Sequence, residues 1–477
     1  MADGRQATEL WRLTARQAVD LLRRRKVSPD ELVDTAESRI AATEGALNAM
    51  PTLCFDRARA RIAGLDRLDA SHPGWLGGLP IGVKDLNDVE GVRTTFGSPI
   101  YADNVSKKTD LGVRNLEARG ALVVGKTNTP EFGAGAQTFN EVFGVTRNPW
   151  DTRMTCAGSS GGSAVALAAG QVWLATGSDL GGRLRNPASF CSVVGFRPSP
   201  GRVPSGPSMI PLEPYAAHGP MARNVADVAL MLDAYTGLQP GDPLSLEQPA
   251  VPFQRAVEAP VRPARVAWSV DLGQCPVDRE VAAICEAAAR RIAGLGCTVD
   301  AAHPDASGAR EAFQTMRAHN MATARAGLLK SHRDKLKPEV IWNIEAGLKL
   351  SIDDVRRAVH LQRELYQRFV AFFETFDILV TPASQHPPFP VEMRYVVEIN
   401  GQKMETYVAW LLTPSIITMT GLPCLSIPCG FTKTGLPVGL QLVGPPRGEA
   451  KLLSAAHLVE EMLGLAGDVP LDPVVRH

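Results

Sequence analysis

The chain has 477 residues, of which 45% are apolar and 21% charged, and its 50 basic side chains balance 50 acidic ones. Such a composition is typical of a large globular protein with a substantial core. The lack of net charge argues against a nucleic-acid or anionic-membrane partner and favours a small, weakly charged one. The N-terminus lacks the apolar centre of a signal peptide, and no stretch reaches the ~20 apolar residues of a membrane span, so we expect a cytoplasmic protein.

The eight cysteines are scattered through the chain, without the paired spacing of a zinc site. Because the cytoplasm keeps thiols reduced, we expect free side chains that are mostly buried in the core. The sequence therefore predicts neither a disulfide framework nor a metal centre.

Two helix starts are marked near the N-terminus by capping boxes, Thr14 with Gln17 and Ser28 with Glu31. A helical N-terminal arm is therefore predicted over residues 1–65. The following segment, residues 66–250, alternates short apolar runs with helix-like stretches, which favours a mostly parallel or mixed sheet covered by helices. Its predicted strands include residues 81–83, 121–124 and 172–175, and its predicted helices include 111–119 and 163–169. Gly120 and Gly170 stand where helix C-caps are expected.

Residues 238–263 are rich in proline and glycine and are predicted to form a surface connection. Residues 251–377 are expected to be mainly helical, and residues 378–477 to return to the sheet. The predicted helices lie near 278–294, 308–330 and 352–375, the last with a capping box at Ser351 and Asp354. The predicted strands lie near 378–381, 424–427 and 438–443. Composition alone would divide the chain into two domains near residue 250.

Two glycine-rich turns stand out as candidate sites. Residues 159–163, Ser-Ser-Gly-Gly-Ser, run directly into an apolar helix, so they present backbone N–H groups beside hydroxyls rather than a flexible linker. Residues 179–182, Asp-Leu-Gly-Gly, follow an apolar strand and suit either a tight turn or an oxyanion hole. Lys84 ends a further apolar run; it is either a strand-end charge or, if buried, a base with a lowered pKa.

One motif is a false lead. Residues 120–127 match the phosphate-loop pattern GxxxxGK[ST], but their centre is strand-like and Asn128-Thr129-Pro130 follows where a helix should start. The chain contains no HExxH motif, and His218 is expected to be structural. A Ser-His-Asp mechanism and any cofactor are therefore not predicted.

Several segments, in order along nearly the whole chain, resemble the amidase signature family. They are residues 82–85, 125–132, 148–151, 156–163, 177–187, 219–223, 379–382 and 435–441. The resemblance implies a single α/β/α domain over residues 1–477 around a large mixed, twisted sheet, which overrules a division near 250. It also implies hydrolysis of C–N bonds in amides, with anilides and carbamates as further candidate substrates, by a Ser-Ser-Lys triad.

Carried over residue by residue, the resemblance makes Lys84 the base and Ser159, reached through a cis peptide after Gly158, the middle serine, with Ser160 in support. The nucleophile position falls on Arg183. In an intact site the side chain at 183 would attack the carbonyl and form an acyl-enzyme.

The resemblance also implies an oxyanion hole, built from the backbone amides of Leu180, Gly181, Gly182 and residue 183. Asp179 and Arg185 would brace this turn by a buried ion pair.

Arg183 breaks the pattern, because a guanidinium stays protonated and has no lone pair to attack with. Loss of a hydrolase nucleophile costs on the order of a millionfold in turnover. We favour a single substitution in an otherwise ordinary amidase, since the surrounding motifs are intact. A non-catalytic homologue that binds a carboxylate is an alternative, and takeover by Ser159 or Ser160 is disfavoured because neither would point into the oxyanion hole.

Partners follow from the same reasoning: a small-molecule amide or carbamate as substrate, and neither nucleic acid nor membrane. A further alternative is the A subunit of a tRNA-dependent amidotransferase, which would require partner subunits. Tyr407 and Trp410, in the apolar segment 385–410, are candidate walls of an apolar substrate pocket, although the segment could equally be a surface excursion. Monomer and homodimer both remain open.

Overall fold

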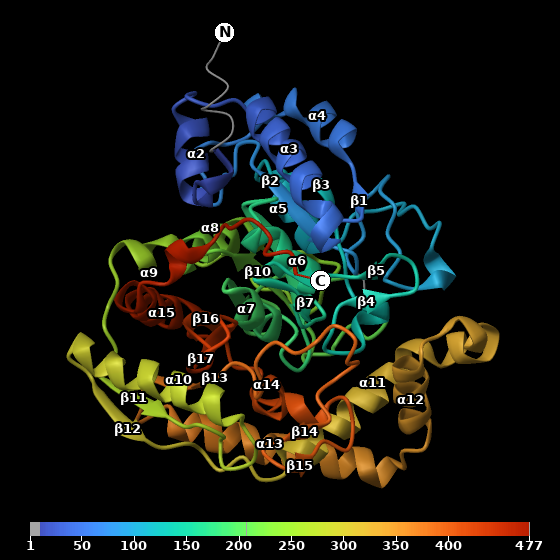
Figure 1. The fold of residues 1–477 in the computed structure, drawn as a ribbon, viewed down its shortest axis with the longest axis vertical. Helices are drawn as coiled ribbons and strands as arrows, with labels where there is room; N and C mark the ends of the chain where they lie inside the picture. Colours follow the sequence, from blue (N-terminus) through green and yellow to red (C-terminus); the bar gives the residue numbers. More distant parts are fainter. Residues whose placement is uncertain (1–9, 207, 477) are drawn as a thin grey trace.

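An 11-stranded sheet runs through the molecule, whose computed structural model describes residues 10–206 and 208–476 (Figure 1). In spatial order its strands are β1 (Thr52–Leu53), β3 (Leu122–Thr127), β2 (Pro80–Lys84), β8 (Leu174–Asp179), β10 (Ala217–Ala222), β9 (Val194–Arg197), β16 (Cys424–Phe431), β17 (Pro437–Val443), β13 (Ile378–Pro382), β11 (Arg265–Trp268) and β12 (Thr298–Ala301). Three two-stranded sheets accompany it: β4 (Phe139–Asn140) with β5 (Gly144–Val145), β6 (Arg147–Asn148) with β7 (Asp151–Thr155), and β14 (Glu398–Ile399) with β15 (Gln402–Lys403).

The large sheet is mixed. β3, β2 and β8 are parallel, the strands from β8 through β10, β9, β16 and β17 to β13 are antiparallel, and β13, β11 and β12 are again parallel. Because one continuous sheet contains strands from both sides of residue 250, the chain forms a single α/β domain. The expected fold class is confirmed, and the division suggested by composition is wrong.

Helices cover both faces of this sheet. They are α2 (Ala15–Arg23), α3 (Pro29–Leu47), α4 (Phe55–Ile62), α5 (Leu111–Ala118), α6 (Gly161–Ala168), α7 (Arg185–Cys191), α8 (Val225–Tyr235), α9 (Gln254–Glu258), α10 (Arg279–Arg291), α11 (Ala309–Ser331), α12 (Pro338–Leu348), α13 (Ile352–Phe372), α14 (Leu412–Thr420) and α15 (Glu449–Leu463). Side chains alternate across the strands. Val123 therefore packs in one core with α8 and α15, whereas Val124 packs in another with α3 and α6.

The local signals in the sequence act as expected in this fold. Thr14 and Ser28 cap α2 and α3 with complete capping boxes, and Ser351 does the same for α13. Gly120 and Gly170 follow α5 and α6 with φ of 91° and 73°, a left-handed conformation that glycine adopts without steric cost. Each of these helices is thereby turned back toward the sheet.

Residues 251–377 contain α9 to α13 and also supply β11 and β12 at one end of the sheet. α11 and α12 project beside the C-terminal segment that carries α14, as Figure 1 shows. This placement brings α11 to the edge of the cavity described below.

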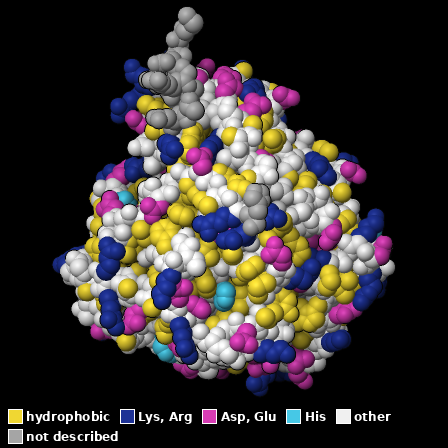
Figure 2. Space-filling model, viewed as in Figure 1, with side chains coloured by type: hydrophobic (Ala, Val, Ile, Leu, Met, Phe, Trp, Pro, Cys, Tyr) yellow, Lys and Arg dark blue, Asp and Glu magenta, His cyan; other side chains and the backbone are white. Residues whose placement is uncertain are grey.

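Basic and acidic side chains are interspersed over the face seen in Figure 2, in keeping with the equal numbers of each. Within the described ranges, every helix is too short or too polar to cross a membrane.

Candidate active site

Lys84 is the centre of a cluster of hydroxyls. It is the last residue of β2, a strand buried along its whole length, and is itself 0% exposed. Its Nζ lies 2.7 Å from Ser159 Oγ, 2.8 Å from Ser160 Oγ and 3.1 Å from Ser178 Oγ. Burial, assisted by the positive charge of Arg183, lowers the pKa of Lys84 well below its usual value. The amine is thus suited to be neutral and to accept a proton from a neighbouring hydroxyl.

The serine-rich turn is held in place by close backbone packing. The Gly158–Ser159 peptide bond is cis, and Ser160 is the N-cap residue of α6. A Cβ at Gly162 would lie 2.3 Å from the backbone N of Asn128, so only glycine permits this approach. The turn therefore delivers Ser159 and Ser160 to Lys84 as part of a rigid strand-to-helix connection.

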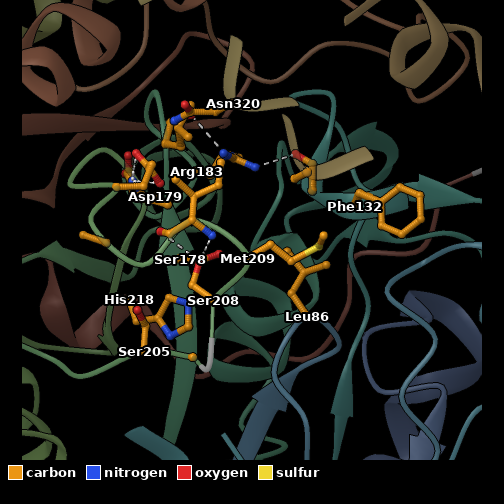
Figure 3. Close-up of a pocket in the computed structure, with 18 of the residues that line it drawn as sticks. Leu86, Phe132, Ser178, Asp179, Arg183, Ser205, Ser208, Met209, His218 and Asn320 are labelled. Carbon is orange, nitrogen blue, oxygen red and sulfur yellow. Dashed lines mark hydrogen bonds between the residues drawn. The ribbon is translucent and has the colours of Figure 1, made fainter. Parts of the chain in front are cut away.

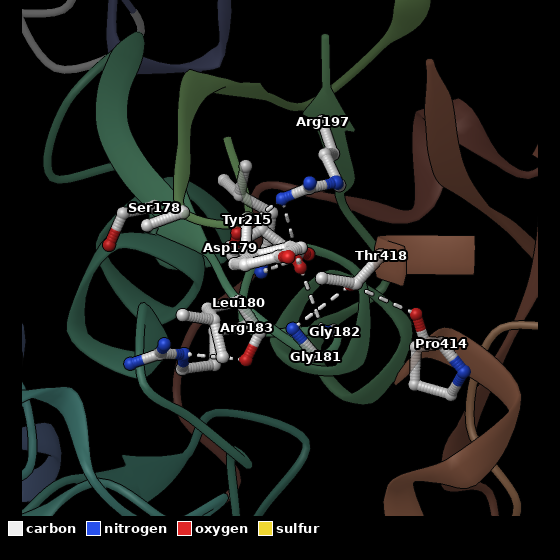
Figure 4. A network of polar contacts seen from close by, with 12 residues as sticks. Ser178, Asp179, Leu180, Gly181, Gly182, Arg183, Arg197, Tyr215, Pro414 and Thr418 are labelled. Carbon is white, nitrogen blue, oxygen red and sulfur yellow. Dashed lines mark hydrogen bonds and ion pairs between the residues drawn. The ribbon is translucent and has the colours of Figure 1, made fainter. Parts of the chain in front are cut away.

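Asp179 organises the diglycine turn (Figure 4). Its carboxylate accepts hydrogen bonds from the amides of Gly182 and Leu184, at 2.8 and 3.0 Å, and from Nε and Nη2 of Arg185, at 3.0 and 2.9 Å. Arg197 lies 3.8 Å away and donates to the Asp179 carbonyl. Burial alone would raise the pKa of Asp179, but the two guanidiniums hold it well below its usual range. The carboxylate is accordingly ionised and fully paired.

Two of the amides expected to form the oxyanion hole are already hydrogen-bonded within the protein. The amide of Gly181 donates to Thr418 Oγ1 at 3.0 Å, and that of Gly182 donates to Asp179 at 2.8 Å. Buried N–H groups require such partners, and here α14 and the Asp179 carboxylate supply them. Neither amide is free to receive an oxyanion in this structure. Within the described ranges, the amide of Arg183 takes part in none of the hydrogen bonds formed, and it remains a candidate donor.

Arg183 lies beside the serine cluster. Its Nε donates to the Leu180 carbonyl at 3.1 Å, and its Nη1 donates to the Gly133 carbonyl at 2.9 Å. A Cβ at Gly133 would lie 2.6 Å from Arg183 Nη1 and 3.4 Å from Ser159 Oγ. The guanidinium therefore occupies space next to Ser159.

A cavity of about 480 Å³ opens at this point (Figure 3). The residues that line it include Ser178, Leu180, Arg183, Phe313 and Tyr407. Ser178 was not anticipated from the sequence. It immediately precedes Asp179, but only the fold shows that its hydroxyl reaches Lys84.

The two pocket residues expected from the sequence have different environments. Tyr407 lines the cavity. Trp410 does not: it is 0% exposed and packs edge-to-face on Phe389, with ring centroids 5.6 Å apart. Its indole contributes to a separate aromatic core with Phe190. The expectation that Trp410 forms a wall of the substrate pocket is therefore corrected.

The family model named amidase matches residues 31–453. The chain belongs to the amidase signature family of hydrolases. An acylamidase of Rhodococcus erythropolis is 33% identical, over 94% of this chain and 95% of that protein. The A subunit of the glutamyl-tRNA(Gln) amidotransferase of Moorella thermoacetica is 35% identical, over 95% of this chain and 97% of that protein.

Among solved structures, a bacterial aryl acylamidase of the amidase signature family superposes with a TM-score of 0.87 and 26% identity, covering 96% of this chain and 99% of that one. This likeness over the whole length of an amidase signature enzyme agrees with the single mixed sheet.

Proposed function

We propose that the chain carries the active-site scaffold of an amide C–N hydrolase that acts on small-molecule amides, with anilides and carbamates as further substrates. The observation that carries the proposal is the buried Lys84 amine, which lies 2.7 Å from Ser159 Oγ beside the cavity that position 183 enters. We propose that the protein acts in the cytoplasm and that its chemistry needs no cofactor.

In an intact site of this geometry, a hydroxyl at position 183 attacks the amide carbonyl carbon. Its proton passes through Ser159 to the neutral amine of Lys84. The C–N bond then breaks, the leaving amine takes up the proton, and water releases the acyl group from the hydroxyl oxygen. The amide of residue 183 is the candidate donor to the developing oxyanion.

Arg183 disables this route for two reasons. The guanidinium has no lone pair with which to attack. Held by the carbonyls of Leu180 and Gly133, it also fills space that the acyl group would need. We therefore propose that turnover by the chain is lower than that of an intact site by a factor on the order of a million.

The experiment is the substitution Arg183→Ser, assayed on p-nitroanilides and aryl carbamates beside the unchanged chain. The matched control is Arg183→Ala, which removes the guanidinium without supplying a hydroxyl. Hydrolysis by Arg183→Ser alone is the expected result. Equal rates for the unchanged chain and Arg183→Ser would reject the assigned role of position 183.

A second candidate is the A subunit of a tRNA-dependent amidotransferase, favoured by the 35% identity to a relative of that name. Such a protein works with partner subunits, so the two candidates differ in assembly. Arg183→Ser acting on amides as a lone chain would support the hydrolase. Activity that appears only on addition of amidotransferase partner subunits would support the second candidate.

A further inference from the structure

Arg317 is a buried cation in the cavity wall. It lies on α11, is 8% exposed and is surrounded by the rings of Phe313, Trp342 and Tyr407. Its Nη1 makes one long contact, 3.5 Å, to the Tyr407 hydroxyl, and its Nε has no hydrogen-bond partner within the described part of the chain. A buried guanidinium is normally paired with an anion, because desolvation of an unpaired charge is costly.

Arg183 is a second cation in the same cavity. The carbonyls of Leu180 and Gly133 accept its hydrogen bonds but carry no net charge to offset it. Burial lowers the pKa of Arg183, and the charge of Arg317 adds to this effect. Both guanidiniums, however, remain protonated at any ordinary pH.

The acidic groups near these arginines are engaged elsewhere. Asp179 forms an ion pair with Arg185, and Glu213 accepts hydrogen bonds from the backbone amides of Tyr215 and Ala216 in its own loop. Within residues 10–206 and 208–476, neither Arg183 nor Arg317 has a carboxylate at ion-pair distance.

A further donor lies next to Arg317. Asn320 follows it on α11, lines the cavity and has a buried Nδ2 without a partner in the described residues. Figure 3 shows Asn320 on the side of the cavity toward which the Arg183 side chain extends. The cavity thus combines two guanidiniums and a free amide N–H group, a set that an anionic oxygen group would satisfy.

We propose that this cavity binds a small alkyl or aryl carboxylate, held between Arg317 and Arg183, with its apolar part against Phe313. The inference rests on the proposed function, because this ligand is the acid half of an amide. It deepens that function by making the charged acid, rather than the neutral amide, the preferred ligand of the chain as it stands.

Isothermal titration calorimetry on the full chain tests the proposal with two pairs of nearly isosteric probes, benzoate against benzamide and hexanoate against hexanamide. We expect each acid to bind at least about 10-fold more tightly than its amide, because hydrogen bonds to a charged group contribute about 1.5–3 kcal/mol, or roughly 10- to 150-fold in affinity. Equal affinity within each pair, or no binding of either acid, would overturn the proposal.

The substitution Arg317→Met keeps the apolar stem and removes the charge. We expect it to weaken acid binding by about 10-fold or more and to weaken amide binding by a smaller factor. The control is Arg290→Met on the exposed face of α10, where the arginine side chain is 77% exposed, and acid binding should be unaffected. If Arg317→Met does not fold, Asn320→Ala provides the second test, with weaker acid binding expected. Unchanged acid affinity in the folded variants would reject the site.

Failure of this inference is distinguishable from failure of the proposed function. If Arg183→Ser hydrolyses amides while Arg317→Met leaves acid binding unchanged, the carboxylate site is rejected and the hydrolase stands. If Arg183→Ser is inert but acid binding depends on Arg317, the hydrolase assignment is rejected and the carboxylate site stands.

Discussion

Substituting Asp179 with Asn should strongly destabilise the domain. The carboxylate is 0% exposed and accepts four hydrogen bonds, two from backbone amides and two from Arg185, with Arg197 close by. Asparagine retains one acceptor oxygen, but it places an NH₂ group against the donors of Arg185 and leaves both guanidiniums without a counter-charge.

The magnitude follows from the burial of these charges. Removing one partner of a buried ion pair typically costs about 3–5 kcal/mol. The bonds to Gly182 and Leu184 are lost or weakened together with the pair, so their contributions do not add independently. We expect a loss of about 3–5 kcal/mol in the free energy of unfolding at neutral pH.

Urea unfolding, followed by circular dichroism, measures this loss. Asp353→Asn is the matched control, because its side chain is 80% exposed and pairs with Arg356 on the surface of α13; a change within about 0.5 kcal/mol is expected there. Both measurements should be made well above pH 3.8, the ordinary pKa of an aspartate. The pKa of Asp179 is depressed in the folded state, so its contribution to the free energy of unfolding is fully present there and is lost only as the pH falls. A loss below about 1 kcal/mol for Asp179→Asn would refute the bracing role.

Three further predictions concern the site and its surroundings. In Arg183→Ser, kcat/KM should rise with pH as Lys84 loses its proton and should level off well below 10.5, because burial lowers the pKa of Lys84; a rate that climbs through pH 10.5 would contradict a neutral amine. Trp410→Ala should cost about 3–5 kcal/mol in urea unfolding, as expected for a large core side chain. Trp410→Phe should leave benzoate affinity unchanged, and a weakened affinity would return this residue to the pocket.

Local signals in the sequence predicted much of the fold. A capping box specifies a helix start through two reciprocal hydrogen bonds, and Ser28 and Ser351 form them in the structure. Signals of this kind are short-range, so they can be recognised without knowledge of the neighbours. The same holds for Gly120, whose positive φ ends α5.

Elements without such signals were missed. α7 and α14 lack a side-chain cap, and all their residues are buried, so no polar face reveals a helical period. α14 nevertheless matters to the site, because the hydroxyl of its Thr418 accepts a hydrogen bond from the Gly181 amide. The assignment of that amide to an oxyanion hole failed because its partner lies far away in the sequence.

The residues around the cavity show the same limit of prediction from sequence. Ser159 and Lys84 could be placed together from family motifs, and they lie 2.7 Å apart. Arg317 carries no motif, and its importance depends on what surrounds it: aromatic rings, no carboxylate at ion-pair distance among the described residues, and Arg183 across the cavity. Only the three-dimensional arrangement reveals that an unpaired charge is buried there.

The structure also explains how position 183 can carry an arginine without loss of the scaffold. Asp179 braces the turn through the amides of residues 182 and 184 and through Arg185, and none of these contacts uses the side chain at 183. The guanidinium leaves the turn toward the cavity, where it bonds to the Gly133 carbonyl. Because the turn is held independently of that side chain, the backbone at position 183 should stay in place when arginine is replaced by serine. Chemistry at 183 can therefore be changed separately from the stability of the turn, as the proposed loss of turnover by a single substitution requires.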